Sequence, residues 1–573
     1  MTRQNKDLTR GFPKTKGLEV AIIGAGVSGL YSAYRLTHSS NPLFDAGKVQ
    51  IFEMSHRIGG RLESVCLPGM EIPGELGGMR YMTSQKIITT LIKNVFSSEL
   101  TSVDFPTGNN KNHFGYFRKQ RLRLRAWNDS QEKKQKLETR YYLNEDDKGF
   151  SADQLFNKVV YDVLRHDSWF MDQYGSKISH PSEYEYTFHL TRRDWDHVKP
   201  EIIYNFKGAY NGEKVNDIGF WNLIKDQVSE EGYTFLANAG GYYSNTINWN
   251  SAEAFPYMVE DFSDDKMKYK TIEGGYDKIA YALADAYLRK HGAAIWGGNR
   301  LLAFHESKNT GYRYELVFFN EDEKKEHSIL ANRIILGMPK RSLELLNQYN
   351  FFFDRNTRKI LQRNIDSVIT EPSFKILMGF EEPWWKKDFG TQAGRSITDL
   401  PMRQCYYFGT NPDDSHSLFL GSYNDMRSAI FWSVLDHGPP YEPKETKLVS
   451  SANLQDLKPI QAPERMVDEV MNQVREVHGR QDIPQPYVTW PKDWTRDPYG
   501  GGYHAWRAGY DVPDVMKYMR KPYSDENIFI CGDAYSNQQG WVEGAFCVTE
   551  NMLQEHFGLK WPEWLDKSYY LGW

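Results

Sequence analysis

Residues 20–36 read VAIIGAGVSGLYSAYRL, which is an apolar run, a glycine-rich turn and a helical pattern, and a second apolar run follows at 49–52. The three glycines of the turn have separate uses. Gly24 lets the chain turn sharply, Gly26 lets the backbone approach a pyrophosphate, and Gly29 lets helix and strand pack closely. The helix then presents free N–H groups and the positive end of its dipole to phosphates. The pattern predicts a dinucleotide-binding βαβ unit; the alternative is a glycine-rich turn in an ordinary globular protein.

The end of the second apolar run carries an acid. Glu53 stands where a carboxylate can accept hydrogen bonds from the ribose hydroxyls of an adenosine. An acid in place of an arginine argues against a 2′-phosphate, so FAD or NAD fits better than NADP. Glu53 lies further from Gly29 than the usual spacing, and the polar stretch 38–48 predicts an inserted loop that accounts for the excess.

A basic, glycine-rich stretch follows Glu53 directly as HRIGGRLES. Arg57 and Arg61 can neutralise a pyrophosphate while Gly60 allows close backbone approach, which a flavin cofactor needs and a nicotinamide cofactor does not. The alternative is a basic surface turn. Further on, residues 74–82 (GELGGMRYM) place a second glycine pair beside an arginine.

The C-terminal part supplies complementary pieces. Residues 528–531 predict a short strand that ends at Gly532 and Asp533, and a carboxylate at a strand end can bind ribityl hydroxyls. The chain then reads GWVEGA from Gly540 and continues as a helical pattern to about Leu553. A helix that begins near 543–545 would direct its positive end at the flavin N1–C2=O edge and favour electron acceptance.

With these motifs in this order, the chain resembles the FAD-dependent amine oxidases, and within them the L-amino-acid oxidases. Internal blocks at 273–287, 331–346 and 373–385 extend the resemblance. It implies an α/β fold: a discontinuous Rossmann-like FAD-binding domain, a mixed-sheet substrate domain and a helical insertion. The residues that it places against FAD are Gly24, Ala25, Gly26, Ser28, Gly29, Glu53, Arg57, Gly60, Arg61, Gly78, Met79, Arg80, Gly532, Asp533, Gly540, Trp541 and Val542.

The implied domains are discontinuous in sequence. They are 17–80 with 265–370 and 500–573 for FAD, 81–150 with 371–499 for substrate, and 151–264 for the helices. Amphipathic helical patterns occur at 152–164 and 217–227, within the third of these. Strand-like runs at 374–380 and 417–423 predict the sheet that covers the reactive face of the flavin.

Four residues are implied at the reacting end. Arg80 would bind the substrate carboxylate and Tyr423 would add its hydroxyl; the alternatives are a structural salt bridge and an ordinary core or surface tyrosine. The resemblance implies that Lys375 holds a water near flavin N5. An apolar strand is an unusual place for a lysine, because burying it unpaired is costly, and this favours a functional role over the alternative of a strand-end lysine that reaches solvent. Trp541 would form an aromatic wall beside flavin and substrate, or be an ordinary core residue. Trp384 and Trp385 are expected to be packing residues.

The resemblance implies oxidative deamination of L-amino acids to 2-oxo acids by FAD and dioxygen, with release of ammonia and hydrogen peroxide, in a homodimer. The alternatives are a mono- or polyamine oxidase, an amino-acid 2-monooxygenase and a flavin-binding protein without catalysis. Aromatic residues make up 14% of the chain, which favours substrates with large aromatic, hydrophobic or basic side chains. Glu253, Glu260 and Asp261 would pair with a basic side chain or form a solvated helix face.

Composition restricts the class further. The hydrophobic fraction of 40% and charged fraction of 25% are ordinary for a soluble globular protein. The basic stretch 117–127 (FRKQRLRLRAW) predicts a strand with one charged face, and the net charge of −5 argues against a nucleic-acid partner. The 4 cysteines show no paired spacing, so neither a disulfide frame nor a metal site is expected.

No membrane or secretion signal is visible in the sequence. No apolar run reaches the roughly 20 residues of a membrane helix. The N-terminal residues lack the apolar core of a signal peptide, so a cytoplasmic location is expected, although a removed leader would leave no trace.

Overall fold

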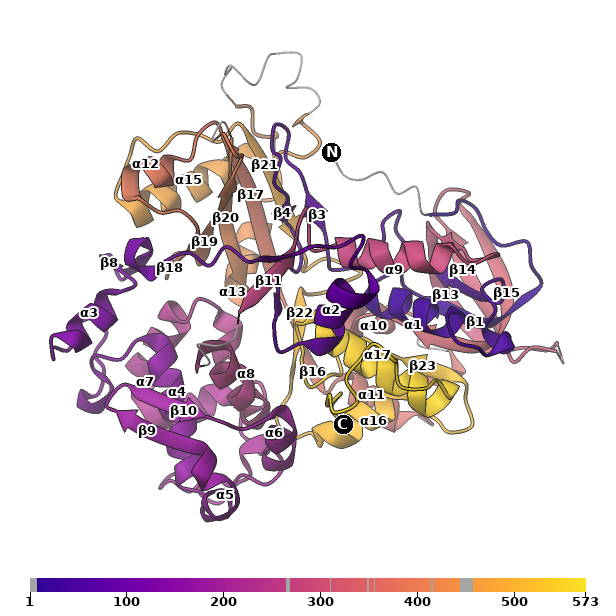
Figure 1. The fold of residues 1–573 in the computed structure, drawn as a ribbon, viewed down its shortest axis with the longest axis horizontal. Helices are drawn as coiled ribbons and strands as arrows, with labels where there is room; N and C mark the ends of the chain where they lie inside the picture. The colour runs from indigo at the N-terminus through magenta and orange to yellow at the C-terminus, as the bar shows by residue number, and fades with distance from the viewer. Residues whose placement is uncertain are drawn as a thin grey trace.

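The structure is a computed structural model of the 573-residue chain. It describes residues 8–263, 268–309, 311–347, 350–354, 356–413, 416–443 and 457–573, without the side chains of 110 and 260–263. Figure 1 shows three parts that meet at the centre of the molecule: two sheets with their helices, and a third part made mainly of helices.

The first sheet is the predicted dinucleotide-binding sheet. Within the described residues it has seven strands, in the order β12–β2–β1–β15–β14–β13, with β23 paired to β15. The strands are β1 Gly17–Ile23, β2 Val49–Phe52, β12 Ile295–Trp296, β13 Asn299–Glu306, β14 Tyr314–Asn320, β15 Lys325–Leu336 and β23 Ile528–Ile530. Since β2, β1, β15 and β23 run parallel, their carboxyl ends meet at one edge, which is where open α/β sheets bind ligands.

The helix predicted after the glycine turn is confirmed as α1 (Val27–Thr37). It packs between α9 (Lys278–Leu288) and α17 (Val542–Phe557), so segments from the beginning, middle and end of the chain cover one part of the sheet. The predicted strand at 528–531 and the helix that follows it are also confirmed. Residues 38–48 form the predicted loop, with one short 3₁₀ turn at Pro42–Phe44.

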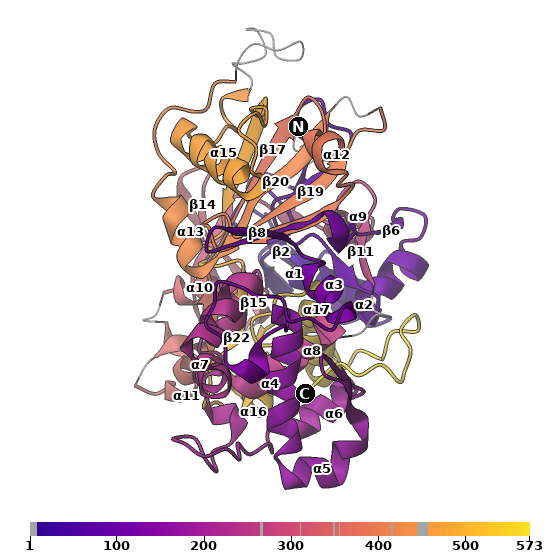
Figure 2. The same cartoon turned by 90° about the vertical axis from the view of Figure 1, so that its left-hand side faces the viewer.

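The second sheet is mixed, as expected. Its order is β21–β17–β20–β19–β18–β7–β8, and β18 and β7 are parallel while the other neighbours are antiparallel. The strands are β7 Phe114–Phe117, β8 Gln120–Arg123, β17 Ser373–Phe380, β18 Gly394–Thr398, β19 Gln404–Thr410, β20 Ser417–Asp425 and β21 Val488–Asp493. Helix α15 (Glu464–His478) lies along β17 and β20 (Figure 2), and α12 (Trp384–Phe389) buries both predicted packing tryptophans.

The prediction of one strand at 117–127 is wrong. The segment instead forms the β7–β8 hairpin and the start of α3 (Ala126–Glu132). Arg118 and Lys119 form the turn with φ of 48° and 61°, a conformation that favours glycine and asparagine. Because arginine and lysine are not typical turn residues, the sequence did not indicate a turn here. The basic side chains have partners inside the protein: Arg118 pairs with Glu231 at 2.8 Å.

The helical part consists of α4 Ala152–Arg165, α5 Ser168–Tyr174, α6 Arg192–Val198, α7 Phe220–Ala239 and α8 Ser251–Ser263, with a hairpin of β9 Ile178–Ser182 and β10 Glu185–Phe188. Ser151 begins α4 with a capping box to Gln154, which confirms the helix predicted at 152–164. The helix predicted at 217–227 begins later, at Phe220, because residues 215–217 form a 3₁₀ turn.

A small sheet joins two of the predicted domains. Strand β11 (Tyr269–Ile272) pairs with β5 (Tyr81–Met82) and β6 (Ser102–Asp104), so a segment assigned to the FAD domain pairs with one assigned to the substrate domain. We keep the domain boundaries as a proposal. The remaining elements are β3 Ser64–Val65, β4 Gly74–Glu75, α2 Lys86–Thr90, α10 Lys340–Glu344, α11 Lys359–Ile365, β16 Val368–Glu371, α13 Met426–Ser433, β22 Tyr503–Trp506 and α16 Val512–Arg520.

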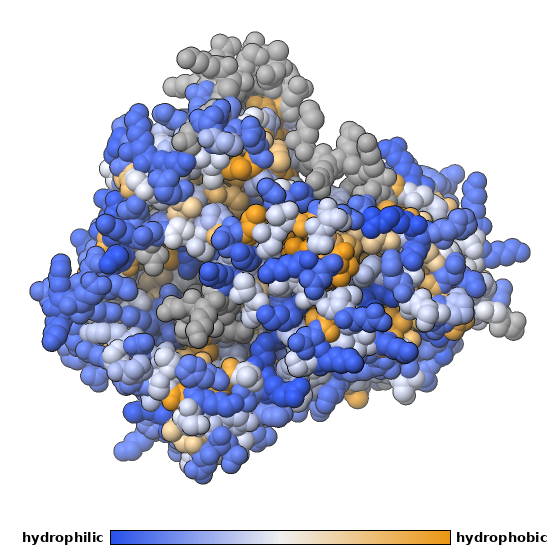
Figure 3. Space-filling model, in the orientation of Figure 1, coloured by the Kyte–Doolittle hydropathy of each residue, from blue (hydrophilic) through white to orange (hydrophobic). Residues whose placement is uncertain are grey.

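The surface in Figure 3 is mainly hydrophilic, with small separate hydrophobic patches. None of the helices in the described ranges combines the length and the apolar character needed to cross a bilayer. Cys405, Cys531 and Cys547 are buried free thiols. Over the same ranges, no group of three or more His, Cys, Asp or Glu side chains is arranged to hold a metal ion. The homodimer and the cytoplasmic location stay predictions.

Candidate active site

A cavity of about 540 Å³ follows the carboxyl-end edge of the first sheet and reaches the second sheet. The residues that follow four parallel strands line it: Gly24 after β1, Glu53 after β2, Gly337 after β15, and Gly532 near the end of β23. The predicted site residues along this cavity are Gly24, Gly26, Ser28, Glu53, Gly60, Arg61, Gly78, Met79, Arg80, Tyr423, Gly532, Asp533, Gly540, Trp541 and Val542. Four others, Ala25, Gly29, Arg57 and Lys375, lie behind its wall.

The glycine turn leaves no space for a side chain at Gly24 or Gly29, and it leaves the backbone of Gly26 open. A Cβ on Gly29 would lie 1.9 Å from the carbonyl oxygen of Gly24. Gly24 has a φ of 103°, and a Cβ there would lie 2.6 Å from the Gly337 oxygen. A Cβ on Gly26 would meet only the Gly60 Cα, at 4.0 Å, so the backbone here is open to the cavity. This cradle fits the pyrophosphate of a dinucleotide.

Glu53 is held with its carboxylate at the cavity. Its Oε2 accepts a hydrogen bond from the backbone N–H of Ala25 at 2.8 Å, and Oε1 accepts one from Ser55 at 2.9 Å. A carboxylate offers about four lone-pair positions, so each oxygen retains capacity for a ribose hydroxyl. The geometry fits the role predicted for Glu53.

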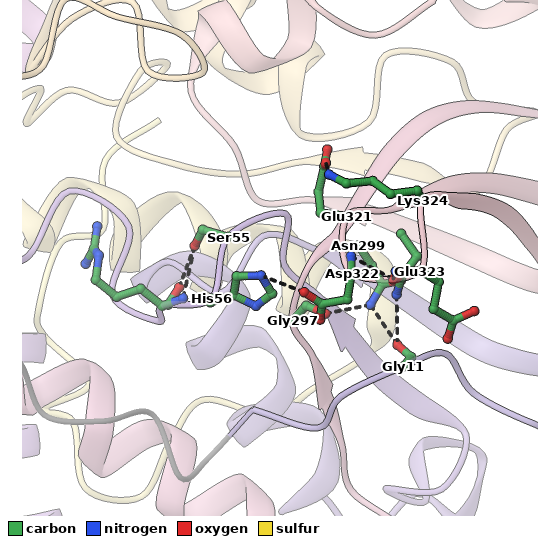
Figure 4. Close-up of polar contacts among 11 residues, drawn as sticks. Gly11, Ser55, His56, Gly297, Asn299, Glu321, Asp322, Glu323 and Lys324 are labelled. Carbon is green, nitrogen blue, oxygen red and sulfur yellow. Dashed lines mark hydrogen bonds and ion pairs between the residues drawn. The ribbon is translucent and has the colours of Figure 1, made fainter.

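The wall beyond β2 is built by contacts shown in Figure 4. The Nδ2 of Asn299 donates to the backbone oxygens of Gly11 at 3.0 Å and Gly297 at 2.8 Å. Outside it, His56 Nε2 lies 3.2 Å from Asp322 Oδ1. Because Asn299 also lines the cavity, these contacts fix the wall next to Glu53.

The two arginines of the second glycine-rich stretch have different positions. Arg57 donates to the backbone oxygens of Ile58 at 3.0 Å and Leu62 at 2.7 Å, so its guanidinium holds the turn and does not face the cavity. Arg61 faces the cavity and forms an ion pair with Asp533. Burial raises the pKa of Asp533, but the charge of Arg61 and the hydrogen bond with His504 lower it by more. The pKa of Asp533 therefore lies well below its usual range, and the carboxyl is ionised.

Helix α17 begins at the cavity, as predicted. Trp541 is its N-cap residue, and Val542 and Ala545 line the cavity. Glu543 points elsewhere: its two oxygens accept the backbone N–H groups of Ile87 and Ile88 at 2.8 and 2.9 Å. The positive end of α17 therefore faces the cavity while its acidic residue fixes α2.

Arg80 and Trp541 meet through an aromatic ring at the other end of the cavity. The Arg80 guanidinium lies 3.9 Å from the centre of the Tyr269 ring and 5.3 Å from that of Phe105. Tyr269 in turn stacks on Trp541 at 6.4 Å with an interplanar angle of 9°. No acidic side chain of the described residues forms an ion pair with Arg80, so the structural salt bridge considered above is absent there.

Tyrosines form the rest of this wall. The Tyr423 ring meets Tyr242 edge-on at 5.3 Å and lies 6.3 Å from Tyr406. Burial raises the pKa of Tyr423, and Arg80 opposes that shift. The structure therefore brings Arg80 and Tyr423 into one wall, and Tyr423 is neither an isolated core residue nor a surface residue.

Lys375 lies directly behind this wall. It is the cross-strand neighbour of Tyr423, and its Nζ lies 4.5 Å from the centre of the Tyr423 ring. The Nζ donates to the backbone oxygens of Glu75 at 3.1 Å and Gly77 at 2.5 Å, so it does not reach solvent. Burial lowers the pKa of Lys375 to about 7, with Glu75 opposing that shift and Arg80 adding to it.

Sequence reasoning missed several cavity residues. Arg395 on β18 lines the cavity, as do Tyr242, Tyr257 and Tyr503. No motif marks Arg395, because it stands in an ordinary strand sequence that only tertiary folding brings to the cavity. Glu253 is buried in an ion pair with Lys199 at 2.8 Å, so it is neither a solvated residue nor available to a basic substrate. The side chains of Glu260 and Asp261 lie outside the described residues.

The parallel sheet, the glycine cradle and Glu53 define a dinucleotide-binding α/β protein, and comparison with known proteins gives the family. The family model described as flavin containing amine oxidoreductase matches residues 27–547, so the chain belongs to this family. FAD is accordingly its cofactor, and the expected fold class is confirmed.

Individual proteins are similar to this chain over most of its length. The chain is 26% identical to aplysianin-A of Aplysia kurodai over 562 residues, which cover 94% of this chain and 90% of that protein. It is 24% identical to L-amino-acid oxidase 4 of Hebeloma cylindrosporum over 593 residues, which cover 97% and 84%. The structure of wild-type putrescine oxidase bound to putrescine is similar with a TM-score of 0.58 and 15% identity, over 94% of this chain and 99% of that one, and shares the fold.

Proposed function

We propose that this oxidoreductase deaminates L-amino acids. The net reaction converts an L-amino acid, dioxygen and water to a 2-oxo acid, ammonia and hydrogen peroxide. When bound, FAD supplies the hydride acceptor and passes the electron pair to dioxygen. The proposal depends on Arg80, a half-buried guanidinium that lines the cavity and has no ion-pair partner among the described residues.

Arg80 is suited to bind a carboxylate. A planar guanidinium pairs with a carboxylate through two parallel hydrogen bonds, which fixes orientation as well as position. The Tyr269 ring supports one face of Arg80, and Tyr423 is available as a second donor on the same wall. Fixing the carboxylate fixes the adjacent Cα, and such positioning can lower a barrier by several kcal/mol.

The amine must react in its neutral form. As the Cα–H bond breaks, the nitrogen lone pair forms the C=N bond of the imino acid, which water then converts to the 2-oxo acid and ammonia. Lys375, with its lowered pKa and its position behind Tyr423, is the best candidate to take up a proton through a bound water.

The other candidate activities use this site less well. A mono- or polyamine has no anionic group for Arg80, and its ammonium would be repelled by the guanidinium. An amino-acid 2-monooxygenase would use Arg80 in the same way but yields an amide and carbon dioxide. A flavin-binding protein without catalysis would show no anaerobic bleaching with any amino acid.

The test is a screen of the holoenzyme for peroxide and ammonia release with the twenty L-amino acids, their D-forms and common amines. We expect L-amino acids alone to be oxidised. Arg80→Ala should raise KM by about 100-fold, the order expected for a lost charged hydrogen-bonded pair, while FAD stays bound. Arg289→Ala, a change at an exposed arginine, is the matched control. Oxidation of amines alone, or unchanged kinetics of Arg80→Ala, would disprove the proposal.

A further inference from the structure

A second guanidinium faces the cavity near Arg80. Arg395 lines the same cavity from β18. Burial lowers the pKa of Arg80, nearby phenols such as Tyr406 raise it, and Arg395 lowers it again. Geometry also places Arg395 in this wall: it binds Gln404 Oε1 at 3.0 Å, the Tyr406 hydroxyl donates to the same oxygen at 3.4 Å, and the Tyr406 ring lies 6.3 Å from that of Tyr423. A substrate that carries only an α-carboxylate brings one negative charge to these two positive charges.

Hydrogen bonds hold Arg395 in place, and no acidic side chain in the described part of the chain forms an ion pair with it. Its guanidinium donates to Oε1 of Gln404 at 3.0 Å, and Nε2 of Gln404 donates to the backbone oxygen of Gly241 at 3.0 Å. Burial lowers the pKa of Arg395, but Tyr406, Tyr242 and Asp153 raise it by more, so on balance the pKa is above its ordinary value, as is that of Arg80. Asp153 stands in the first turn of α4 and forms no ion pair with Arg395.

The remaining charged groups of the cavity do not balance these two arginines. Lys375 behind the wall is cationic or neutral. The carboxylates that line the cavity have partners of their own: Glu53 accepts the Ala25 N–H, Asp497 pairs with Arg341, and Asp533 pairs with Arg61. Asp153 acts on Arg395 and Asp425 acts on Tyr423, but neither carboxylate lines the cavity. Among the described residues, this end of the cavity therefore presents two guanidiniums and no carboxylate of its own.

The charge of the wall selects among side chains. A buried charge without a partner is costly, and a ligand carboxylate removes that cost by pairing with it. A lysine or arginine substrate would add a further cation beside Arg395, and an apolar side chain would leave Arg395 desolvated and without an ion-pair partner. A side-chain carboxylate removes both problems. The expectation of aromatic, hydrophobic or basic side chains came from composition, which does not report the charge of this wall.

We propose that Arg395 binds a side-chain carboxylate and that the preferred substrates are dicarboxylic L-amino acids, L-glutamate or L-aspartate. This inference rests on the proposed function, because it takes Arg80 as the binding site of the α-carboxylate. Arg395 is then the residue that sets specificity. Arg80 binds the α-carboxylate, which every L-amino acid carries, so it does not distinguish between side chains.

Steady-state peroxide release by the holoenzyme tests the inference. L-glutamine and L-norleucine are neutral analogues of L-glutamate, and L-lysine is a cationic one. We expect kcat/KM for L-glutamate or L-aspartate to exceed that of each neutral analogue by about 100-fold. Arg395→Met should remove this preference by lowering kcat/KM for the dicarboxylic substrates to the level of the neutral analogues, and Arg395→Lys should restore part of the preference. A preference for L-norleucine or L-lysine, or an equal loss with every substrate, would overturn the inference.

A binding measurement separates this inference from the proposed function. Glutarate has two carboxylates and no amine, and valerate has one carboxylate. We expect glutarate to raise the unfolding temperature of the holoenzyme more than valerate does, and Arg395→Met to abolish the difference with FAD content unchanged. If amino acids are oxidised but glutarate binds no better than valerate, the inference is wrong and deamination stands. If glutarate binds better but no amino acid is oxidised, deamination is wrong and the two-carboxylate site stands.

Discussion

The guanidinium of Arg80 lies 3.9 Å from the centre of the Tyr269 ring, although the two residues are far apart in sequence. They meet because Arg80 immediately precedes β5, and β5 pairs with β11, which carries Tyr269. Tyr269 also stacks on Trp541 at the N-terminus of α17. The arginine, the phenol and the indole therefore form one stack along the cavity wall.

Tyr269→Leu should weaken substrate binding through Arg80. A cation–π contact of this kind contributes about 0.5–2 kcal/mol, so we expect KM to rise by about 2- to 30-fold with little change in kcat. Steady-state kinetics with the best L-amino acid measures this. Tyr142→Leu is the control, because Tyr142 is 86% exposed and does not line the cavity. Equal KM values in the two variants would show that the ring does not support Arg80.

Lys375→Met should change the pH dependence of the reaction. The pKa of Lys375 is lowered to about 7, so its neutral form increases as the pH rises through that value. If the neutral amine accepts a proton, kcat/KM of the wild type rises as the pH passes through about 7. In the variant this rise, the limb near pH 7 of the profile, should be absent, and kcat/KM should be about 100-fold lower. The limb set by the substrate ammonium, at higher pH, should remain.

The control for Lys375 is its neighbour across the sheet. Lys492 on β21 pairs with Glu63 at 2.6 Å, outside the cavity wall. Lys492→Met should keep the pH profile of the wild type. A Lys375→Met profile that keeps the limb near pH 7 would assign that limb to another group and remove Lys375 from proton transfer.

Gly29→Ala should prevent FAD binding. The added Cβ would lie 1.9 Å from the Gly24 oxygen, and neither backbone can move without opening the turn between β1 and α1. The cost should exceed the about 1–3 kcal/mol typical of an overpacked core. FAD content after purification and the unfolding temperature are the measurements. Gly47→Ala, where the Cβ meets only a side-chain oxygen at 3.2 Å, should bind FAD normally. A yellow, stable Gly29→Ala protein would contradict the structure of the turn.

His478 should make the protein sensitive to acid. Its Nδ1 donates to the Val474 oxygen at 2.7 Å, and its Nε2 accepts from the Tyr407 hydroxyl at 2.6 Å, so the fold holds the neutral ring. Burial lowers the pKa of His478 to about 4. Between that value and the ordinary value of about 6.5 the unfolded chain binds a proton that the folded protein does not. Stability is therefore complete above about pH 6.5 and falls by about 3 kcal/mol towards pH 4.

Urea unfolding of the wild type and His478→Gln at several pH values measures this contribution. The wild type should be the more stable protein at pH 7, and the difference in unfolding free energy should shrink as the pH falls from 6.5 to 4. His291→Gln, a change at an exposed histidine, should give a constant difference. A constant difference for His478→Gln as well would contradict the prediction.

The cofactor half of the molecule was predictable because its signals are local. The turn after β1 needs glycines at fixed spacing, and Glu53 and Asp533 stand at strand ends that the apolar pattern marks. The hairpin at Arg118 and Lys119 was not predictable, because residues without a turn preference form its turn. Arg57 shows a similar limit: the motif indicated phosphate contact, and the fold uses its guanidinium to hold the turn.

The sequence by itself determined the dinucleotide-binding unit, since a strand, a glycine turn and a helix follow one another along the chain and need no distant partner to be recognised. Only the tertiary structure decided what surrounds Arg80. Tyr269, Trp541 and Arg395 come from separate strands and a helix end, and no local pattern relates them. The charge of a buried wall is the sum over all segments that meet there, and that sum exists only once the chain has folded.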